Sequence, residues 1–415
     1  MKQTSIGLKL AASLALITIL GPSAIDMYLP SMPDMAKDLH TSYGNIQVSL
    51  TVFLMALGAG QLVFGPLIDA YGRRLPLLIG LVVFAAASVG AAFSSSIEWL
   101  LIVRFIQGMA AALTLVVAMS TVRDVAEGNA AAQLFALLMT IEALAPVLAP
   151  AVGGYLDAHF GWQSVLYVLA ILALCAFVNA MFNLPESLPV EKRISLKFGE
   201  VIRTYARIAS CPSFLMPALA LSAVFFFLFG YIGGAAYVYQ THFNLEADTF
   251  GFVFGGTGIA VLLGALVSSK WVPSMGVLRL ANRGVLLIVL GALIAALATY
   301  FGWGLSIIVV GMFVALFGLG IAESTLMSMA MASQQQALGS TAALLGAFQL
   351  VISSMATPIA GTLAELSALH WCAFLFFFSV FVLLLTVFTV RQAHKQEVLQ
   401  QKSAQAKLQA TAVQG

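Results

Sequence analysis

GPLIDAYGRR, residues 65–74, joins two long apolar segments of this chain. Gly72 suits a tight turn, because glycine adopts backbone conformations that other residues avoid. Asp69 closes the first segment, and Arg73 and Arg74 precede the second. A carboxylate that faces a guanidinium across a short turn can hold two helix ends together. The stretch therefore predicts a latch between consecutive helices or, as the simpler alternative, a tight turn whose arginines only set the orientation.

The composition shows that most of this chain is surrounded by lipid. Hydrophobic residues make up 61% of the 415 residues and charged residues only 9%, whereas soluble domains carry about 25% charged residues. Apolar runs recur about twelve times, each of the roughly 18 residues or more that a helix needs to cross the hydrocarbon. Spans this apolar must be helical, since lipid cannot satisfy an open backbone. We predict helices near 8–29, 45–68, 75–93, 98–122, 130–156, 163–183, 213–238, 248–269, 280–301, 305–331, 339–365 and 370–391.

The basic residues predict the orientation of this all-α membrane protein. If the N-terminus is inside, all of the 19 lysines and arginines except Lys37 and Arg104 fall in cytoplasmic segments. This agrees with the rule that the cytoplasmic loops of membrane proteins are rich in lysine and arginine. Both termini are therefore expected in the cytoplasm. The net charge of +2 thus reflects topology, and no nucleic-acid partner is predicted.

A polar stretch divides the spans into two sets of six. The predicted parts are an N-terminal half (1–184), a cytoplasmic linker (185–211) with a surface helix near 196–208, a C-terminal half (212–391), and a cytoplasmic tail (392–415) that is frayed or disordered. Residues 136–156 partly repeat at 343–363, and this register aligns Glu142 with Gln349. Related halves are common in transporters.

Several kinds of chemistry have no counterpart in the sequence. The three cysteines (Cys175, Cys211 and Cys372) and the five histidines lack metal-ligand spacing. There is no GxxxxGK[ST] motif for ATP and no paired base and nucleophile. We predict neither an enzyme nor a cofactor or metal site, and ATP is not expected to energise this chain by itself.

The motifs together resemble the major facilitator superfamily. GPLIDAYGRR is similar to its signature loop, RFIQGMAAA (104–112) to the helix 4 motif of its proton-coupled exporters, and APVLAPAVGG (145–154) to the helix 5 antiporter motif. IDMYLPSMP, GQLVFGP, STVRDV, PESLPVEKR and GSTAALLGAFQ resemble the Bcr/CflA group of drug exporters, which includes bicyclomycin and phenicol exporters. The resemblance implies a twelve-helix major facilitator fold, drug efflux with a proton gradient as the energy source, and a location in a bacterial inner membrane. The chain departs from the helix 5 motif by carrying Ala145 and Ala149 where glycine is usual.

Two intramembrane residues of opposite charge are candidates for proton coupling. At about 1.5 Å per helical residue, Asp26 lies in the outer third of the first helix, and Arg104 lies at a similar depth in the fourth. We expect them to face one another, directly or through water, so that protonation of Asp26 releases Arg104. Alternatively, Asp26 caps a broken helix and Arg104 donates to carbonyls of neighbouring helices.

Further residues are predicted to bind substrate, to form a proton route or to gate. Glu142, near the midplane, either lines the pocket or packs in protonated form; with Glu323, nearer the inside, it could continue a proton route from Asp26, although Glu323 could equally face an inner vestibule without a role. The predicted substrate-binding residues are Asp26, Tyr28, Thr51, Glu142, Phe226, Tyr231 and Gln349. The predicted gating residues are Gly65, Asp69, Gly72, Arg73, Arg74, Pro146, Pro150, Gly153 and Gly154. Among these, Gly65 is expected to let helix backbones approach.

The resulting functional hypothesis is proton-coupled export of small amphipathic drugs. Phenicol antibiotics such as chloramphenicol are the first expected substrates. Its partners would be the drug, protons and the lipid bilayer, and nothing in the sequence requires more than a monomer. One alternative is a transporter of an endogenous metabolite that exports drugs incidentally. Another is a membrane sensor that does not transport.

Overall fold

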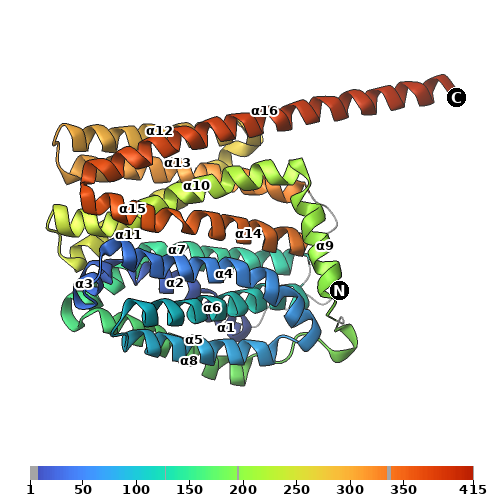
Figure 1. The fold of residues 1–415 in the computed structure, drawn as a ribbon. Helices are drawn as coiled ribbons and strands as arrows, with labels where there is room; N and C mark the ends of the chain where they lie inside the picture. The colour runs from blue at the N-terminus through green and yellow to red at the C-terminus, as the bar shows by residue number, and fades with distance from the viewer. Residues whose placement is uncertain (1–7, 127, 194–195, 334–337, 415) are drawn as a thin grey trace.

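The structure, a computed structural model, describes residues 8–126, 128–193, 196–333 and 338–414. It is a bundle of long helices that run roughly side by side (Figure 1). Within the described residues, twelve spans are long and apolar enough to cross a membrane. The predicted all-α fold with twelve transmembrane helices is therefore confirmed.

Eight helices and one 3-10 turn form the first half of the bundle. They are α1 (Leu8–Thr18), α2 (Leu20–Asp26), η1 (Leu29–Ser31), α3 (Met32–Asp38), α4 (Tyr43–Tyr71), α5 (Arg74–Ala92), α6 (Ile97–Val125), α7 (Gly128–Phe160) and α8 (Trp162–Asn183). The linker contains the 3-10 turn η2 (Val190–Lys192) and the surface helix α9 (Phe198–Ala209), which lies where the sequence predicts it.

The second half is built from a further set of helices. They are α10 (Pro212–Tyr237), the π-helical turn η3 (Val238–His242), α11 (Ala247–Met275), α12 (Val277–Tyr300), α13 (Leu305–Ala332), α14 (Leu338–Ser354), α15 (Ala356–Leu366) and α16 (Ala368–Gln414). The tail is helical and continues α16 away from the bundle (Figure 1). It contains no glycine or proline before its last residue, so nothing in its sequence stops the helix.

Two spans are broken, and the breaks matter for the site. The first span runs to Asp38 rather than ending near residue 29, and it is divided into α1, α2, η1 and α3. The eleventh is interrupted at Met355, between α14 and α15. Prolines and turns in these segments interrupt the ladder of backbone hydrogen bonds. Each break leaves backbone carbonyls free to accept hydrogen bonds from side chains.

The main contacts between the two halves join two pairs of membrane spans. α7 packs against α11, and α4 packs against α14 and α15. In Figure 1, α9 lies across the end of the bundle at which α16 leaves it, and α3 lies at the opposite end. We call these the α9 end and the α3 end; the basic residues predict that the α9 end is cytoplasmic.

Candidate functional site

Arg104 of α6 occupies the interior of the first half and is fully buried. Its guanidinium lies between the rings of Tyr28 and Phe53, 4.3 Å from each ring centroid. Nη1 donates a hydrogen bond to Gln107 Oε1 at 2.7 Å, and Nη2 donates to the carbonyl oxygen of Ala24 at 3.2 Å. The cation is therefore stabilised by aromatic faces and neutral oxygen atoms.

Asp26 lies two residues after Ala24, at the end of α2, and is 5% exposed. Among the residues that the structure describes, its carboxyl group has no hydrogen bond and no ion pair. The predicted direct pairing with Arg104 is thus wrong for this conformation. The depth prediction holds, but α2 presents the carbonyl of Ala24 to α6, as in the alternative in which Arg104 donates to a neighbouring carbonyl.

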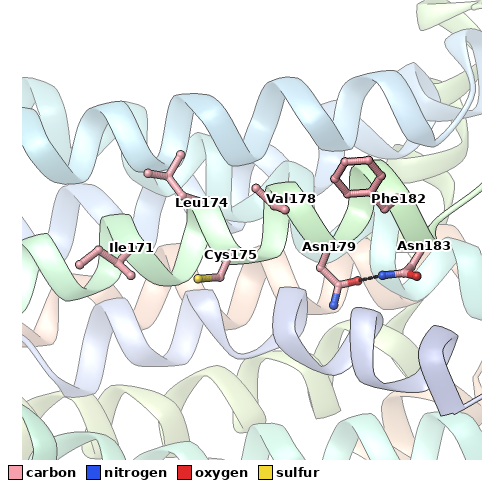
Figure 2. A pocket seen from close by; sticks show the side chains of 7 residues that line it. All are labelled: Ile171, Leu174, Cys175, Val178, Asn179, Phe182 and Asn183. Carbon is pink, nitrogen blue, oxygen red and sulfur yellow. Dashed lines mark hydrogen bonds between the residues drawn. The ribbon is translucent and has the colours of Figure 1, made fainter.

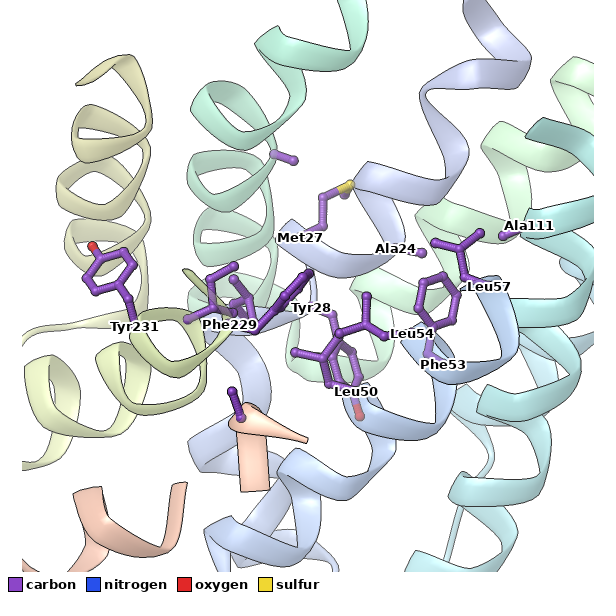
Figure 3. Packing of buried hydrophobic residues seen from close by; sticks show 14 of the residues in the cluster. Ala24, Met27, Tyr28, Leu50, Phe53, Leu54, Leu57, Ala111, Phe229 and Tyr231 are labelled. Atoms are coloured by element: carbon purple, nitrogen blue, oxygen red, sulfur yellow. The ribbon is translucent and has the colours of Figure 1, made fainter. Parts of the chain in front are cut away.

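Tyr28 and Thr51, both predicted to bind substrate, are buried and already hydrogen-bonded. The Tyr28 hydroxyl shares a hydrogen bond of 2.8 Å with Ser49 Oγ of α4. The Thr51 hydroxyl is 2.8 Å from the Thr357 hydroxyl and donates to the Ser354 carbonyl, at 3.1 Å, where α14 and α15 separate. Thr51 therefore joins the two halves. Figure 3 shows Tyr28 beside the α4 side chains of this core.

The aromatic candidates of α10 point to different places. Tyr231 stacks on Phe254 with 5.2 Å between ring centroids, and its hydroxyl is 2.9 Å from Thr257 Oγ1. Phe226 instead stacks on Phe378 of α16, 4.3 Å between centroids. Phe226 and Tyr231 therefore face different neighbours, because five helical residues rotate the two side chains about 140° apart. Their role in substrate binding stays a prediction.

Glu142 on α7 and Glu323 on α13 place one acidic side chain in each half of the bundle. Both side chains are partly exposed. Within the described chain, neither has a hydrogen bond or an ion pair. Gln349 on α14 is also partly exposed, and its side-chain amide has no hydrogen bond to a described residue. The predicted proton route through Asp26, Glu142 and Glu323 stays a prediction.

Glycines let α7 and α11 touch through their backbones. A side-chain carbon on Gly251 or Gly255 of α11 would collide with the carbonyl oxygen of Pro150 or Val147 of α7. Such small-residue contacts are typical of helix packing in membranes.

The predicted gating glycines differ in their surroundings. A side-chain carbon on Gly154 of α7 would collide with the Ala247 carbonyl oxygen of α11, and one on Gly153 would collide with the carbonyl oxygen of Met27, the residue that follows α2. Gly65 does not serve this purpose, since a side-chain carbon there would meet nothing within 4 Å. The prediction that Gly65 allows helix approach is therefore wrong; α4 turns this residue away from its neighbours.

An acidic residue that sequence reasoning missed connects the halves at the α3 end. Glu365, in the last turn of α15, accepts a hydrogen bond of 2.6 Å from the backbone N–H of Tyr43, the first residue of α4. A carboxylate is favourable at a helix N-terminus and unfavourable at a C-terminus. Glu365 thus opposes the dipole of its own helix and complements that of α4. An acid at a predicted helix C-terminus was the signal in the sequence.

Close backbone approach supports this contact. A side-chain carbon on Gly44 would lie 2.6 Å from Thr362 Cγ2, and one on Gly361 would lie 2.8 Å from Gln47 Cγ. Nearby, Gln240 donates to the Pro30 carbonyl at 2.9 Å. The α3 end is therefore closed by polar contacts between the halves.

Removing the Glu365 carboxylate is expected to open the α3 end. Glu365→Ala removes a helix cap worth about 0.5–2 kcal/mol, so the closed population should fall by up to about 30-fold relative to the open one. Spin labels at Ser95→Cys and Ser306→Cys, exposed positions in the two halves, measure the distance between the halves. The labels are introduced in a variant without the native cysteines. Glu365→Gln, whose amide oxygen can still accept, should have a smaller effect. An unchanged distance distribution in Glu365→Ala, matching the control Glu246→Ala, would contradict this assignment.

At the α9 end, the turn between α4 and α5 has the predicted contact. Arg73 Nη1 lies 2.7 Å from Asp69 Oδ1, and Arg73 Nε donates to Asp124 Oδ2 of α6 at 3.0 Å. Gly72 has φ +94°, and a side-chain carbon there would lie 2.6 Å from Glu186 Oε2. Glycine is therefore required both by conformation and by space.

Glu186 of the linker binds this turn, which sequence reasoning did not identify. It accepts from the backbone N–H groups of Arg73, Arg74 and Leu188 and lies 3.7 Å from the Arg193 guanidinium. Partial burial acts to raise the pKa of Glu186, but these donors and the arginine charge together hold the pKa below its ordinary value. The linker is thereby attached to the first half.

The stabilisation by Glu186 is expected to depend on pH. Because the folded pKa is lowered, the contribution is fully present above the ordinary glutamate pKa of about 4.3 and is lost as the pH falls through the folded value. Glu186→Gln should therefore lower the melting temperature in detergent at pH 7 and have little effect near pH 3. If the difference in melting temperature between Glu186→Gln and the intact protein were the same at all pH values, ionisation of Glu186 would be excluded as its cause. Glu191→Gln, at an exposed residue nearby, is the control.

Comparison with known proteins places this geometry in a family. The family model described as Major Facilitator Superfamily matches residues 14–357. The chain is 35% identical over 356 residues to "Uncharacterized MFS-type transporter YdgK" of Bacillus subtilis (strain 168), which covers 85% of this chain and 89% of that protein. It is 29% identical over 325 residues to the "Chloramphenicol resistance protein" of Pseudomonas aeruginosa, which covers 77% of this chain and 76% of that one.

A solved structure agrees with this placement at the level of the fold. The crystal structure of a D-xylose-proton symporter has a TM-score of 0.74 and 14% identity, and the match covers 93% of this chain and 97% of that one. Two six-helix halves, a glycine-lined contact between them, the latch turn and the matching family model lead to one conclusion: the chain belongs to the major facilitator superfamily and is a transporter rather than an enzyme.

Proposed function

We propose that this transporter exports small amphipathic drugs across the bacterial inner membrane in exchange for protons. The observation that carries the proposal is the burial of Asp26 and Arg104 at one level of the first half, without an ion pair between them. Ionised groups inside a membrane are costly, and they mark coupling sites and substrate paths. A relative named for chloramphenicol resistance supports drugs as the cargo.

In the proposed cycle, Asp26 is protonated in the conformation seen here. A neutral carboxyl group needs no counterion, which fits its lack of a partner. When the proton leaves, the carboxylate attracts Arg104 away from the Ala24 carbonyl, to which Nη2 now donates at 3.2 Å. The end of α2 and the interior of α6 then shift together. Exchange of the guanidinium between these two oxygen acceptors is the proposed coupling step.

Glu142, Glu323 and Gln349 are our proposed substrate contacts. Their side chains are partly exposed and have no hydrogen bond to a described residue, whereas the Thr51 and Tyr231 hydroxyls are already bonded. Two carboxyl groups without a hydrogen-bond partner favour molecules that carry a positive charge or hydrogen-bond donors. Phenicols, which carry hydroxyl and amide donors, are the first substrates to test. We propose a monomer that uses the proton gradient and no cofactor.

The proposal is tested in everted membrane vesicles with an imposed proton gradient. Addition of a transported drug should release protons from the vesicle interior, and chloramphenicol should do so first in a broad panel. Vesicles without the protein provide the control. If no drug moves protons but a native metabolite does, drug export is incidental; if neither does, the exchange mechanism is wrong.

A further inference from the structure

We propose that a groove on α8 binds one anionic phospholipid from the membrane leaflet at the α9 end. The groove has a volume of about 460 Å³ and faces away from the centre of the bundle. Figure 2 shows its side chains along one face of α8, several of them pointing toward the neighbouring α1. The lining residues are Ile171, Leu174, Cys175, Val178, Asn179, Phe182 and Asn183.

The length of the groove matches one acyl chain in one leaflet. Its residues run from Ile171 to Asn183, a rise of about 18 Å at about 1.5 Å per residue. One leaflet contributes about 15 Å, half of the roughly 30 Å hydrocarbon core. α8 continues to Trp162 at the α3 end, but none of those residues lines the groove. The groove therefore serves the leaflet at the α9 end.

The chemistry of the groove also changes along its length in the way a phospholipid requires. Toward the midplane its side chains are apolar, and at the α9 end it carries two amides. Asn179 Oδ1 accepts from Ser13 Oγ of α1 at 2.6 Å and from Asn183 Nδ2 at 3.2 Å. Those contacts use the oxygen of Asn179 and leave its N–H groups as donors for ester or phosphate oxygens.

Two cations stand beside this polar end. Arg74 Nη2 donates to the carbonyl of Met181 in the last turn of α8, at 2.7 Å. Lys9 lies on α1 one turn before Ser13, whose hydroxyl lies within hydrogen-bond distance of the backbone carbonyl of Lys9, at 2.7 Å, and of Asn179 Oδ1, at 2.6 Å.

Neither cation is neutralised by a carboxylate among the described residues. The nearby carboxylate of Glu186 contacts the backbone N–H of Arg74 and the guanidinium of Arg193. Two unpaired cations at the polar end attract a lipid head group that carries a net negative charge. A zwitterionic head group, whose net charge is zero, is attracted less strongly.

Native mass spectrometry with lipids of matched acyl chains tests the proposal. The intact protein should retain one phosphatidylglycerol several-fold more strongly than phosphatidylethanolamine. Lys9→Gln should remove most of that preference. Leu174→Trp, which fills the groove, should remove the binding, whereas Leu174→Ala should preserve it. Equal retention of both lipids by the intact protein would overturn the proposal.

Matched controls separate this site from general contact with lipid. Leu384 is 65% exposed on α16, outside the groove, so Leu384→Trp should bind phosphatidylglycerol as the intact protein does. Lys395→Gln removes another exposed cation toward the same end and should leave the preference unchanged. If Leu174→Trp and Leu384→Trp retain the lipid equally, while circular dichroism shows both folded, the groove is not the site.

Discussion

Asp26→Asn is expected to reduce drug resistance to the level of a host without the protein, with drug binding still measurable. Asparagine has almost the same shape as a protonated aspartate, so the buried packing at the end of α2 should persist. It cannot release a proton, and the guanidinium of Arg104 should therefore remain on the Ala24 carbonyl. Uphill efflux should stop, whereas drug binding, measured on the purified protein, should remain.

Asp34→Asn is the matched control for this prediction. Asp34 lies on α3, eight residues further along the chain, and its carboxylate is exposed and paired with Lys37 at 2.7 Å. Exposed ion pairs contribute little, so this variant should confer normal resistance. Active efflux by Asp26→Asn at the rate of the intact protein, measured in vesicles with an imposed gradient, would rule Asp26 out as the coupling residue.

Gly255→Val is expected to abolish transport by forcing α7 and α11 apart. The added side chain would collide with the Val147 carbonyl oxygen, a backbone atom that cannot rotate away. Overpacking of a tight contact costs about 1–3 kcal/mol, enough to disfavour the closed α3 end by roughly 5-fold to more than 100-fold. Labels at Ser95→Cys and Ser306→Cys should then report a longer distance, and resistance should be lost.

The adjacent residue provides an unusually close control. A side-chain carbon on Gly256 would meet nothing within 4 Å, although it follows Gly255 directly in the same helix. Gly256→Val changes helix propensity by the same amount as Gly255→Val, so only the contact with α7 distinguishes the two. Gly256→Val should keep both the distance and the resistance. Equal loss in both variants would attribute the effect to the helix itself.

Sequence reasoning was most reliable for properties that depend on local composition. The twelve spans, the surface helix at Phe198–Ala209 and the turn at Gly72 follow from runs of apolar residues and from single residues with special backbone preferences. It was less reliable for predicting which residues contact one another. It placed Asp26 and Arg104 at one depth but could not specify the rotation of each helix, so it expected an ion pair where a carbonyl lies.

The contacts that close the α3 end were missed for a related reason. Glu365 and Tyr43 are 322 positions apart, and each looks like an ordinary polar residue at a helix end. Likewise, Gly65 and Gly255 are equivalent in sequence terms, yet only Gly255 faces a neighbouring backbone. Nothing in a single helix distinguishes a glycine that faces lipid from one that faces a helix.

The sequence by itself determined that the chain lies in lipid, how many spans it has, which family it belongs to and which ionisable residues lie inside the membrane. These follow from hydropathy and short motifs, which add up locally along the chain. Only the tertiary structure decided what the polar side chains contact: Arg104 binds the Ala24 carbonyl, and Glu365 binds the start of α4. The reason is physical, because a rotation of about 100° per residue and a break in the first span decide what each side chain faces.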